Sequence, residues 1–381
     1  MRGPGVTPAR SPVPSDASPL PTRSEAATPR AAGFAVPSDA DPHAATWTAW
    51  PHGEARWEGM LGAVRTAFAA FAAAVTRFEP LVLLVANEAV RRDAREHLRA
   101  AGAATEAVHL LEVPYDDVWL RDQGPTFLRG ADATRAILDA RFDGWGGRYP
   151  SARDAALPAR VAEALGVRRF AADLVLEGGA VEMASDGTVL ATRTSLLGDV
   201  RNPGWDAART EAALRDQVGA ERVVWLEGGL VDDHTDGHVD TVARFVGPDA
   251  VALVVPDADD AANGAAARAN RAALAAAATA DGRPYAVHAL PLPLDRRPHG
   301  GVRPPRTYAN FVLVNGGLLM PTYGDPRDDV AADVLAAAFP DRTVVGVPAD
   351  ALVTGGGAWH CVSTPEPFGR DGVPLVAGGA P

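Results

Sequence analysis

Paired strands that alternate with helices are the feature that most constrains the fold of this chain. Three hairpins are predicted where two apolar, β-branched runs flank a turn rich in Gly, Asp or Asn, at residues 180–194, 240–256 and 308–324. Helical patterns are predicted at residues 57–78, 88–102, 209–219, 261–280 and 328–340. Single buried strands follow several of these helices, so the alternation predicts an α/β protein.

A short repeat indicates how these elements are organised. The word LEGG occurs at residues 176–179 and again at 226–229, an offset of 50 residues. A repeat of this length is typical of proteins built from several copies of one supersecondary unit. We therefore predict one domain of repeated β-β-α units around a common centre, and not a doubly wound sheet.

Composition marks the ends of that domain. Residues 1–32 are rich in Pro, Ser and Ala and cannot bury enough apolar surface to offset the entropy of ordering them, so we expect a disordered tail. Residues 33–369 are expected to form a single catalytic domain, and residues 370–381 a loose C-terminal tail. No stretch approaches the roughly 18 consecutive apolar residues of a membrane span.

Charge and cysteine content narrow the class of partner and the compartment. The net charge of −12 disfavours nucleic acid and anionic membranes as partners and is compatible with a small cationic ligand. A single cysteine excludes an intrachain disulfide and fits a reducing compartment, so we expect a cytoplasmic protein.

Four motifs place acids, histidines or the only thiol beside glycine or proline, in the loops where catalytic groups concentrate. They are DDVWLRDQGP at 116–125, LEGGAVE at 176–182, DDHTDGHVDT at 232–241 and GGGAWHC at 355–361. The glycines fit neither a phosphate-binding loop nor a dinucleotide fingerprint, and they are also compatible with plain tight turns.

The thiol is Cys361, which ends the last motif. A lone cysteine is commonly a small buried hydrophobe, whereas a nucleophilic one needs help, because a free thiol has a pKa of about 8.5 and is mostly protonated at neutral pH. His360 is adjacent, but neighbours on a strand point to opposite faces. His238, in a loop crowded with carboxylates, is the better candidate for the partner of the thiol.

Three acids, Asp122, Glu177 and Asp240, lie in the other motifs. Asp122 could instead form an ion pair with Arg121, and Asp240 could cap a strand edge. Carboxylates near a thiolate repel it, unless the substrate is itself a cation. A guanidinium presents planar N–H donors that match carboxylates in pairs, and its protonated carbon is the more electrophilic form. The acids therefore favour a guanidinium substrate.

A metal site is the competing interpretation of the third motif. Its oxygen and nitrogen donors are of the kinds that bind Zn²⁺, Mn²⁺ or Mg²⁺. The candidate ligands are Asp232, Asp233, His234, Asp236, His238 and Asp240. Their spacing matches no established metal motif, so we predict neither a metal nor another cofactor.

Taken in order, the motifs resemble those of the agmatine deiminase family, which includes bacterial peptidylarginine deiminases and belongs to the guanidino-group-modifying superfamily. The shared words are DDVWLRDQGPTF, LEGGAVE, RNP, DGHVDT, YANFVLVNGG, YGD, FPDR and GGG followed by HC, and they span nearly all of the chain beyond its N-terminal tail. The resemblance implies a five-bladed α/β propeller of repeated β-β-α-β units with pseudo-fivefold symmetry.

The resemblance also implies roles for individual residues. It places the nucleophile on Cys361, the general acid and base on His238, and the glutamate that holds this histidine on Glu177. The two aspartates that bind the guanidinium fall on Asp122 and Asp240.

Trp119 takes the place of an aromatic side chain that lines the substrate channel. The implied reaction is hydrolysis of agmatine to N-carbamoylputrescine and ammonia, a step of putrescine and polyamine synthesis, through a covalent thiouronium intermediate on Cys361. It needs no cofactor or metal. The implied partner is a small cationic guanidino substrate, and a homo-oligomeric state stays open.

The chain departs from the family in residues expected to hold the far end of the substrate. Where the family usually reads MPAEWEPH, this sequence has VPSDADPH at residues 36–43, with Asp39 and Asp41 in place of glutamates and Ala40 in place of an aromatic residue. Trp359 replaces an aliphatic residue two positions before the cysteine, and STPEP follows the cysteine closely. A deiminase of another guanidino compound or of peptidyl arginine therefore stays an alternative, as do a non-catalytic binder of cations and a metal-dependent ureohydrolase.

Overall fold

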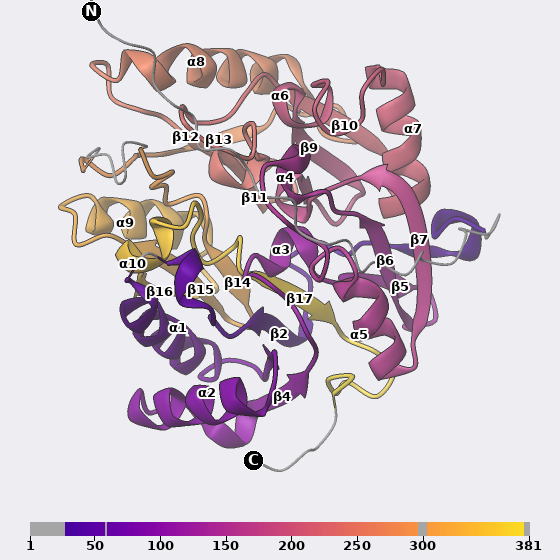
Figure 1. Ribbon diagram of the computed structural model, residues 1–381. Coiled ribbons are helices and arrows are strands. Elements are labelled where there is room, and N and C mark those ends of the chain that lie inside the picture. The colour runs from indigo at the N-terminus through magenta and orange to yellow at the C-terminus, as the bar shows by residue number, and fades with distance from the viewer. Residues whose placement is uncertain (1–26, 58, 296–302, 377–381) are drawn as a thin grey trace, which may run out of the picture.

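The computed structural model describes residues 27–57, 59–295 and 303–376. Within these residues the strands form five separate sheets, and helices pack against them, which confirms the predicted α/β class. Figure 1 shows the sheets following one another around the molecule, with the longer helices at its periphery.

Three of the sheets are built from one unit, in which an antiparallel strand pair is followed by a helix and by a third strand parallel to the second. The units are β8 (Val181–Met183), β9 (Thr188–Thr192), α7 (Ala207–Val218) and β10 (Arg222–Leu226); β11 (Ala243–Gly247), β12 (Ala250–Val254), α8 (Ala261–Ala276) and β13 (Ala286–Leu290); and β14 (Val312–Val314), β15 (Gly317–Thr322), α9 (Asp328–Ala338) and β16 (Thr343–Pro348). The three predicted hairpins are the strand pairs of these units, so they are confirmed.

A fourth sheet contains the same unit with an additional edge strand. The unit consists of β5 (Thr126–Gly130), β6 (Arg135–Arg141), α5 (Leu157–Leu165) and β7 (Arg168–Val175), and β1 (Phe34–Ala35) pairs antiparallel with β5. The sequence patterns had assigned no elements to this region.

The fifth sheet joins segments from the two ends of the folded chain. Strand β17 (Ser363–Pro367) pairs antiparallel with β2 (His43–Ala49), and the parallel strands β3 (Leu81–Val85) and β4 (Val108–Glu112) follow across helices α1 (Leu61–Val75) and α2 (Glu88–Ala100). In Figure 1 the yellow β17 lies beside the indigo β2. This pairing fixes the position of the GGGAWHC segment, which directly precedes β17.

Local signals begin and end the helices. The side chains of Asn87 and Asp206 cap the first turns of α2 and α7, and α7 ends at Gly219, whose left-handed φ of 83° costs glycine no strain. Helix α2 ends before the predicted limit at residue 102, and α8 ends before the predicted limit at residue 280.

The two LEGG motifs occupy the same place in successive units. The first copy follows β7 and the second begins on the last residue of β10, so each comes where the third strand of a unit ends. Short helical elements occupy the connections, namely η2 (Glu54–Arg56), η3 (Thr105–Ala107), α3 (Leu120–Gln123), α4 (Gly144–Gly147), η4 (Gly178–Ala180), α6 (Arg193–Leu196), η5 (Val239–Thr241) and α10 (Asp350–Val353). Of these, α3 lies near the middle of the molecule (Figure 1), where α3, η4 and η5 meet the segment before β17.

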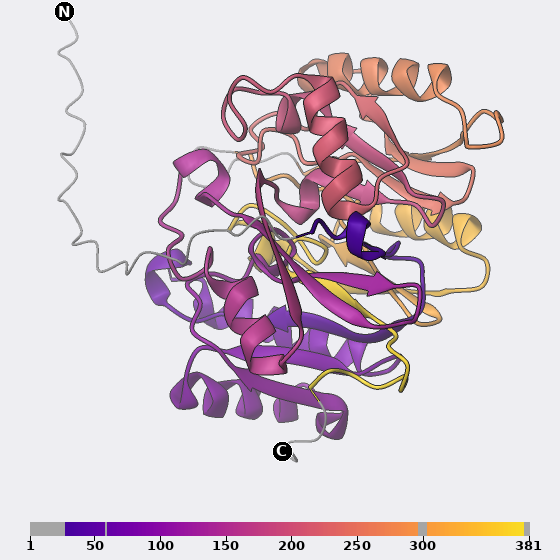
Figure 2. The same cartoon turned by 90° about the vertical axis from the view of Figure 1, so that its right-hand side faces the viewer.

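Figure 2 shows α5 and α7 covering one side of the sheets. Of the predicted N-terminal tail, residues 1–26 lie outside the described residues, whereas Arg30–Ala32 form a 3-10 helix, η1, that contacts α7. Residues 370–376 form turns and bends, and residues 377–381 of the predicted C-terminal tail also lie outside the described residues.

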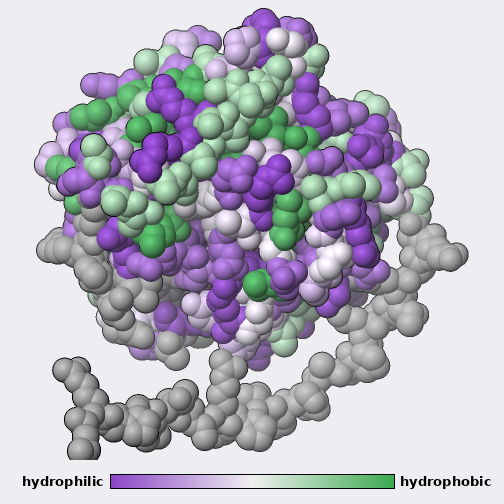
Figure 3. Space-filling model, turned by 90° about the horizontal axis from the view of Figure 1, so that it is seen from above, coloured by the Kyte–Doolittle hydropathy of each residue, from purple (hydrophilic) through white to green (hydrophobic). Residues whose placement is uncertain are grey.

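On the face seen in Figure 3, hydrophilic side chains are interspersed with smaller groups of hydrophobic ones. Among the described residues, no helix combines the length and the apolar character that crossing a bilayer requires.

Candidate active site

Loop segments at strand ends bring the predicted site residues together. Asp122 lies on α3, and Glu177 lies two residues after β7. Asp240 lies on η5, two residues after His238, and Cys361 lies in the turn before β17. All five side chains are buried, with exposures of 0% for Glu177, His238 and Asp240 and of 6–7% for the other two. The fold thus collects in its interior residues from four distant motifs.

Gly179, the last residue of the first LEGG motif, marks the point where three of these side chains meet. A methyl group built on it would lie 2.6 Å from Nδ1 of His238, 2.9 Å from Oδ1 of Asp122 and 3.1 Å from Oδ2 of Asp240. The backbone N–H of Gly179 also donates to Oδ1 of Asp122 at 3.0 Å. Glycine is therefore required here for close approach, and not only for a turn.

The thiol lies beside the same group of acids. Sγ of Cys361 is 3.7 Å from Oδ2 of Asp240 and accepts a hydrogen bond from the Asn310 amide at 3.1 Å. Burial, together with the charges of Asp240 and Asp122, raises the pKa of the Cys361 thiol well above its usual value. The thiol is therefore protonated at neutral pH as long as nothing offsets these charges.

His238 lies between two carboxylates. Its Nδ1 is 3.7 Å from Oδ1 of Asp122 and its Nε2 is 3.5 Å from Oε2 of Glu177. Burial disfavours its charged form, but Asp122 and Glu177 outweigh burial and raise the pKa of His238 to about 9. Both contacts are longer than a normal hydrogen bond, with Nε2 facing Glu177 and Nδ1 on the side of Asp122.

Glu177 is held in turn by Arg201 of the RNP motif. Nε of Arg201 donates to Oε1 of Glu177 at 2.9 Å, and both side chains are fully buried. Arg201 also donates to the carbonyl of Thr235 at 2.9 Å and to the carboxylate of Asp236. Burial opposes the charge of Glu177, but His238 and Arg201 outweigh it and lower the pKa of Glu177. His238 therefore faces an ionised carboxylate.

Asp122 does not pair with Arg121, so that alternative is wrong. Arg121 binds Asp39 instead, at 2.9 Å, while Oδ2 of Asp122 accepts from Nε1 of Trp145 at 2.9 Å. Burial raises the pKa of Asp122 to about 6, the charge of His238 opposes this, and the charge of Asp240 reinforces it. At neutral pH the site therefore holds a carboxylate whose charge is only weakly stabilised, and a bound cation would stabilise it further.

Asp240 is the acid shared by the thiol and by a histidine that the sequence analysis had set aside. Nδ1 of His360 lies 2.7 Å from Oδ2 of Asp240. His360 and Cys361 lie in a turn and not on a strand, so the rule that adjacent side chains point to opposite faces does not apply to them. Burial opposes the charge of Asp240, but His360 outweighs it and lowers the pKa of Asp240. Oδ1 of Asp240 is buried without a hydrogen-bond partner among the described residues.

The three glycines of GGGAWHC are required by the side chains that pack against them, and a methyl group on Gly355 would lie 2.6 Å from the Trp57 ring. Gly356 has a φ of 113°, and a methyl group on it would lie 2.0 Å from the ring of His234. A methyl group on Gly357 would lie 2.8 Å from the Trp119 ring and 2.9 Å from Sγ of Cys361. Trp119 therefore packs directly against the segment that carries the thiol, next to Sγ.

The residues of the candidate metal motif do not share one site. Arg148 and Arg201 bind Asp236, and the backbone N–H and the hydroxyl of Thr235 donate to Asp233 at 2.9 and 2.7 Å. Among the described residues, the six candidate ligands include no group of three donor atoms close enough to hold one ion.

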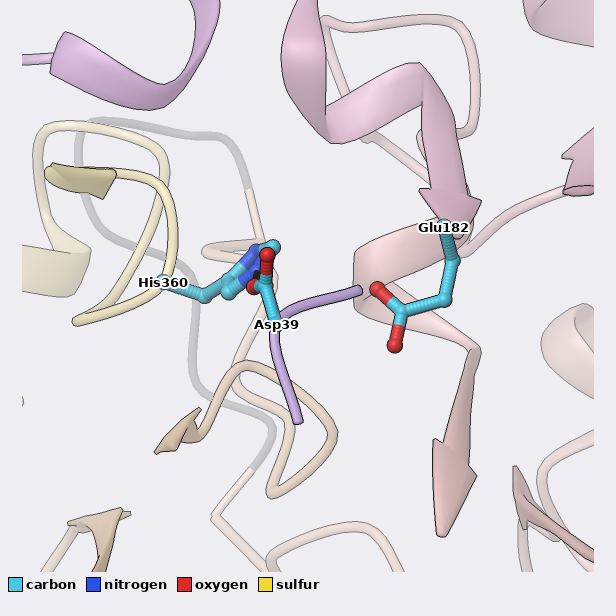
Figure 4. A group of neighbouring side chains, drawn as sticks. All are labelled: Asp39, Glu182 and His360. Atoms are coloured by element: carbon cyan, nitrogen blue, oxygen red, sulfur yellow. Dashed lines mark hydrogen bonds and ion pairs between the residues drawn. The ribbon is translucent and has the colours of Figure 1, made fainter. Parts of the chain in front are cut away.

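A group with that spacing does occur elsewhere, at Asp39, Glu182 and His360 (Figure 4). Arg244, however, donates to Oε2 of Glu182 at 2.8 Å and lies 3.4 Å from Oδ2 of Asp39, where Arg121 also binds at 2.9 Å. Two guanidinium cations therefore already neutralise these carboxylates, and the group does not fit a metal ion.

Trp359, one of the departures from the family, faces away from the thiol. Its ring stacks on Phe71 of α1 at 4.7 Å with an interplanar angle of 2°, and its Nε1 donates to the carbonyl of Val347 at 3.0 Å. It therefore belongs to the apolar core beside α1 and not to a substrate channel.

Sequence reasoning missed three residues that hold the site in place. Asn310 accepts from the backbone N–H of Cys361 at 3.2 Å, Arg201 holds Glu177, and Trp145 holds Asp122. Asn310 lies in the word YANF and Arg201 in the word RNP, and both words were part of the resemblance. Neither word contains a pattern from which the contact of its residue could be predicted.

A buried thiol beside a cationic imidazole and two carboxylates is the equipment of a cysteine-dependent hydrolase that acts on a cationic group. The chain belongs to the family of Porphyromonas-type peptidyl-arginine deiminases, whose model matches residues 35–367.

Similar proteins span nearly the whole chain. The agmatine deiminase of Pseudomonas aeruginosa (strain LESB58) is 34% identical over 368 residues, which cover 90% of this chain and 98% of that protein. The agmatine deiminase of Stutzerimonas stutzeri (strain A1501) is 34% identical over 371 residues, with 90% and 98% covered. A solved structure of the agmatine deiminase of Enterococcus faecalis superposes with a TM-score of 0.84 at 29% identity and covers 91% of this chain and 99% of that one.

Proposed function

We propose that this chain is a deiminase that hydrolyses a guanidino C–N bond, with agmatine as its substrate. The observation that carries the proposal is the convergence of Asp122, Asp240 and His238 on Gly179, beside the thiol. The unpartnered Oδ1 of Asp240 provides a buried acceptor for an N–H donor of a guanidinium.

Binding of the cation prepares the nucleophile. The carboxylates of Asp122 and Asp240 raise the pKa of the Cys361 thiol, and a guanidinium between them offsets their charge. The thiol then loses its proton to solvent and becomes the thiolate that attacks the guanidinium carbon. The same carboxylates keep the substrate protonated and hence electrophilic.

The imidazolium of His238 supplies the proton for the first step. With a pKa of about 9 the ring is charged at neutral pH. As the C–S bond forms and a C–N bond breaks, His238 transfers its proton to the departing nitrogen, which leaves as ammonia. An S-alkylthiouronium on Cys361 remains, and the positive charge of the substrate stays on the carbon centre.

Water completes the reaction. The neutral His238 takes a proton from water as the oxygen attacks the thiouronium carbon, which restores the imidazolium. Collapse of the adduct breaks the C–S bond, releases a neutral urea and regenerates the Cys361 thiolate. The remaining proton ends on ammonia, so the sum is a guanidinium and water giving a urea and ammonium.

Two observations favour a small free substrate over peptidyl arginine. The thiol is only 6% exposed and packs against Gly357 and Trp119, which limits access by a bulky chain. Relatives that match nearly the full chain are named agmatine deiminases, for example that of P. aeruginosa. The description of the matching family model names peptidyl arginine, which therefore stays the second candidate.

We also propose that the five sheets are the blades of a five-bladed α/β propeller with pseudo-fivefold symmetry. The repeated strand order and the β17–β2 pairing, which completes the fifth sheet, support this architecture. We propose as well that the reaction needs neither a metal nor a cofactor. We further propose that the protein works in a reducing compartment, where Cys361 stays a free thiol.

The test is release of ammonia from agmatine, arginine, arginine peptides, and shorter and longer guanidinoalkanes, each with and without a chelator. We expect turnover of agmatine with formation of the urea. Release of urea with an amine and without ammonia would instead identify a ureohydrolase. Binding of the cations without any turnover would identify a non-catalytic binder.

A further inference from the structure

The ring of His360 lies between two carboxylates. Its Nδ1 is 2.7 Å from Oδ2 of Asp240 and its Nε2 is 2.9 Å from Oδ2 of Asp39, and the residue is 1% exposed. Figure 4 shows the ring of His360 directly beside the carboxylate of Asp39, with the side chain of Glu182, on β8, across from them. The mechanism above uses neither His360 nor Asp39.

The state of the ring follows from its partners. Ionised carboxylates can only accept hydrogen bonds, so a ring that bonds to two of them donates from both nitrogens and is an imidazolium. Burial opposes the charge of Asp39, but Arg121 and His360 outweigh it and lower the pKa of Asp39 well below its usual range. A ring with both nitrogens engaged cannot take the thiol proton, so His360 is not the base for its neighbour Cys361.

We propose that His360 is a positioning residue that fixes the orientation and charge of Asp240 for a guanidinium, with Asp39 as its anchor. The inference rests on the proposed function and extends it to residues behind the substrate. By binding Oδ2, His360 stops rotation of the short Asp240 side chain and leaves Oδ1 directed at the ligand.

The anchor is itself rigid. Oδ2 of Asp39 is bound by Arg121 at 2.9 Å and lies 3.4 Å from Nη2 of Arg244, while the backbone N–H of His360 donates to Asn310 at 3.1 Å. His360 is therefore held by its backbone on one side and by its ring on the other. Asp39 lies in the segment that departs from the family, at a position where the family usually has a glutamate.

The charged groups around Asp240 determine how easily its carboxylate is protonated. It is faced by the ring of His360, the ring of His238, the guanidinium of Arg244, the thiol of Cys361 and the carboxylate of Asp122. Removing the His360 cation leaves Asp240 beside another buried acid, so its carboxyl becomes easier to protonate.

Variants of His360 and Asp39 test the proposal. His360→Phe removes both donors, His360→Gln keeps one donor but no charge, and Asp39→Asn keeps the shape of the anchor but not its charge. We expect kcat/KM to fall by about 10- to 100-fold in His360→Phe, as for other residues that orient a functional group, and less in His360→Gln. A separate break in the kcat/KM profile, at lower pH, at which Asp240 becomes protonated, should move to higher pH in both variants.

A second test asks whether the losses of kcat/KM caused by substituting His360 and Asp39 add to one another. If Asp39 acts only through His360, the double variant His360→Gln with Asp39→Asn should be no worse than His360→Gln alone. Additive losses would overturn the assignment of Asp39 as the anchor. Asp39→Asn alone, with its smaller perturbation, keeps the test available if His360→Phe does not fold.

His97→Gln is the control for the loss of a histidine. His97 is a partly buried histidine on α2, with Nδ1 2.9 Å from the backbone carbonyl of Asp93 and its ring packed against Trp50. We expect His97→Gln to lower Tm and to leave kcat/KM and its pH profile unchanged. An equal pH shift in this control would mean that His360 acts only by packing.

A probe that needs no turnover separates failure of this inference from failure of the proposed function. 2-Chloroacetamidine is an amidinium that alkylates a thiolate with loss of chloride, and 2-chloroacetamide is its neutral counterpart with the same leaving group. The wild-type protein should react with the cation in preference to the neutral reagent, and His360→Phe should lose most of that preference. No preference in the wild type would refute the cation site itself, whereas a preference retained by a folded His360→Phe would refute only the role of His360.

Discussion

Replacement of Gly179 by alanine is the perturbation that tests the geometry of the site most directly. The new methyl group would lie 2.6 Å from Nδ1 of His238, which is about 0.8 Å closer than the 3.4 Å at which ordinary contact begins. It would also press on Oδ1 of Asp122 at 2.9 Å and on Oδ2 of Asp240 at 3.1 Å. The three side chains therefore have to separate, and none of them has the length to do so by bending a flexible end.

The expected magnitude follows from this displacement. A shift of reacting groups by about 1 Å costs about 100-fold in rate, so we expect Gly179→Ala to lower kcat/KM by about two orders of magnitude. Overpacking a well-packed interior costs about 1–3 kcal/mol, so the variant should fold with a lower Tm. Steady-state ammonia release and thermal melts measure the two effects separately.

Gly62→Ala is the control for the loss of a glycine. Gly62 lies on α1, and a methyl group on it meets no atom within 4 Å. Alanine should stabilise the helix there by roughly 0.5–1 kcal/mol and leave kcat/KM unchanged. A folded Gly179→Ala variant whose kcat/KM stays within twofold of wild type would show that the three side chains do not converge as described.

Three further outcomes are expected. Cys361→Ser should keep the fold by circular dichroism and lose several orders of magnitude in turnover, and retention of a tenth of the activity would exclude the covalent route. EDTA should leave the rate unchanged, and loss of activity restored by a divalent ion would return the third motif to a metal site. Because the Cys361 thiol must lose a proton while His238 keeps one, kcat/KM should rise with pH to about 9, and Glu177→Gln should move that break to lower pH by removing a carboxylate that stabilises the imidazolium. If the break stays at the same pH in Glu177→Gln, Glu177 does not stabilise the imidazolium of His238.

The local elements of this fold could be predicted because their signals lie within the elements themselves. The three hairpins carry turn residues between apolar runs, and α7 carries an Asp cap at its start and Gly219 at its end. The β17–β2 pairing joins residues more than three hundred positions apart, and no local pattern encodes such a register. The LEGG repeat and the paired strands predicted repeated units around a common centre, and the resemblance added that there are five of them.

The candidate site likewise has a part that could be predicted from the sequence and a part that could not. Cys361, His238 and the acids were identified because their residue types are chemically distinctive in glycine-rich loops. His360 was set aside by a rule for strands, although its segment turns around Gly356 and directs both His360 and Cys361 toward Asp240. Which buried polar groups pair with one another depends on distances between loops, and the sequence does not contain these.

The placement of a thiol against two carboxylates links the charge of the substrate to the reactivity of the enzyme. Two like charges held close together in a buried site disfavour each other's ionised form. Asp240, 3.7 Å from Sγ, therefore keeps the empty site unreactive, and a guanidinium that binds the carboxylates reverses that effect. The urea product is neutral and cannot do the same. Once it forms, Asp122 and Asp240 lose their cation, the thiol is protonated again, and the charge that drove binding no longer holds the product.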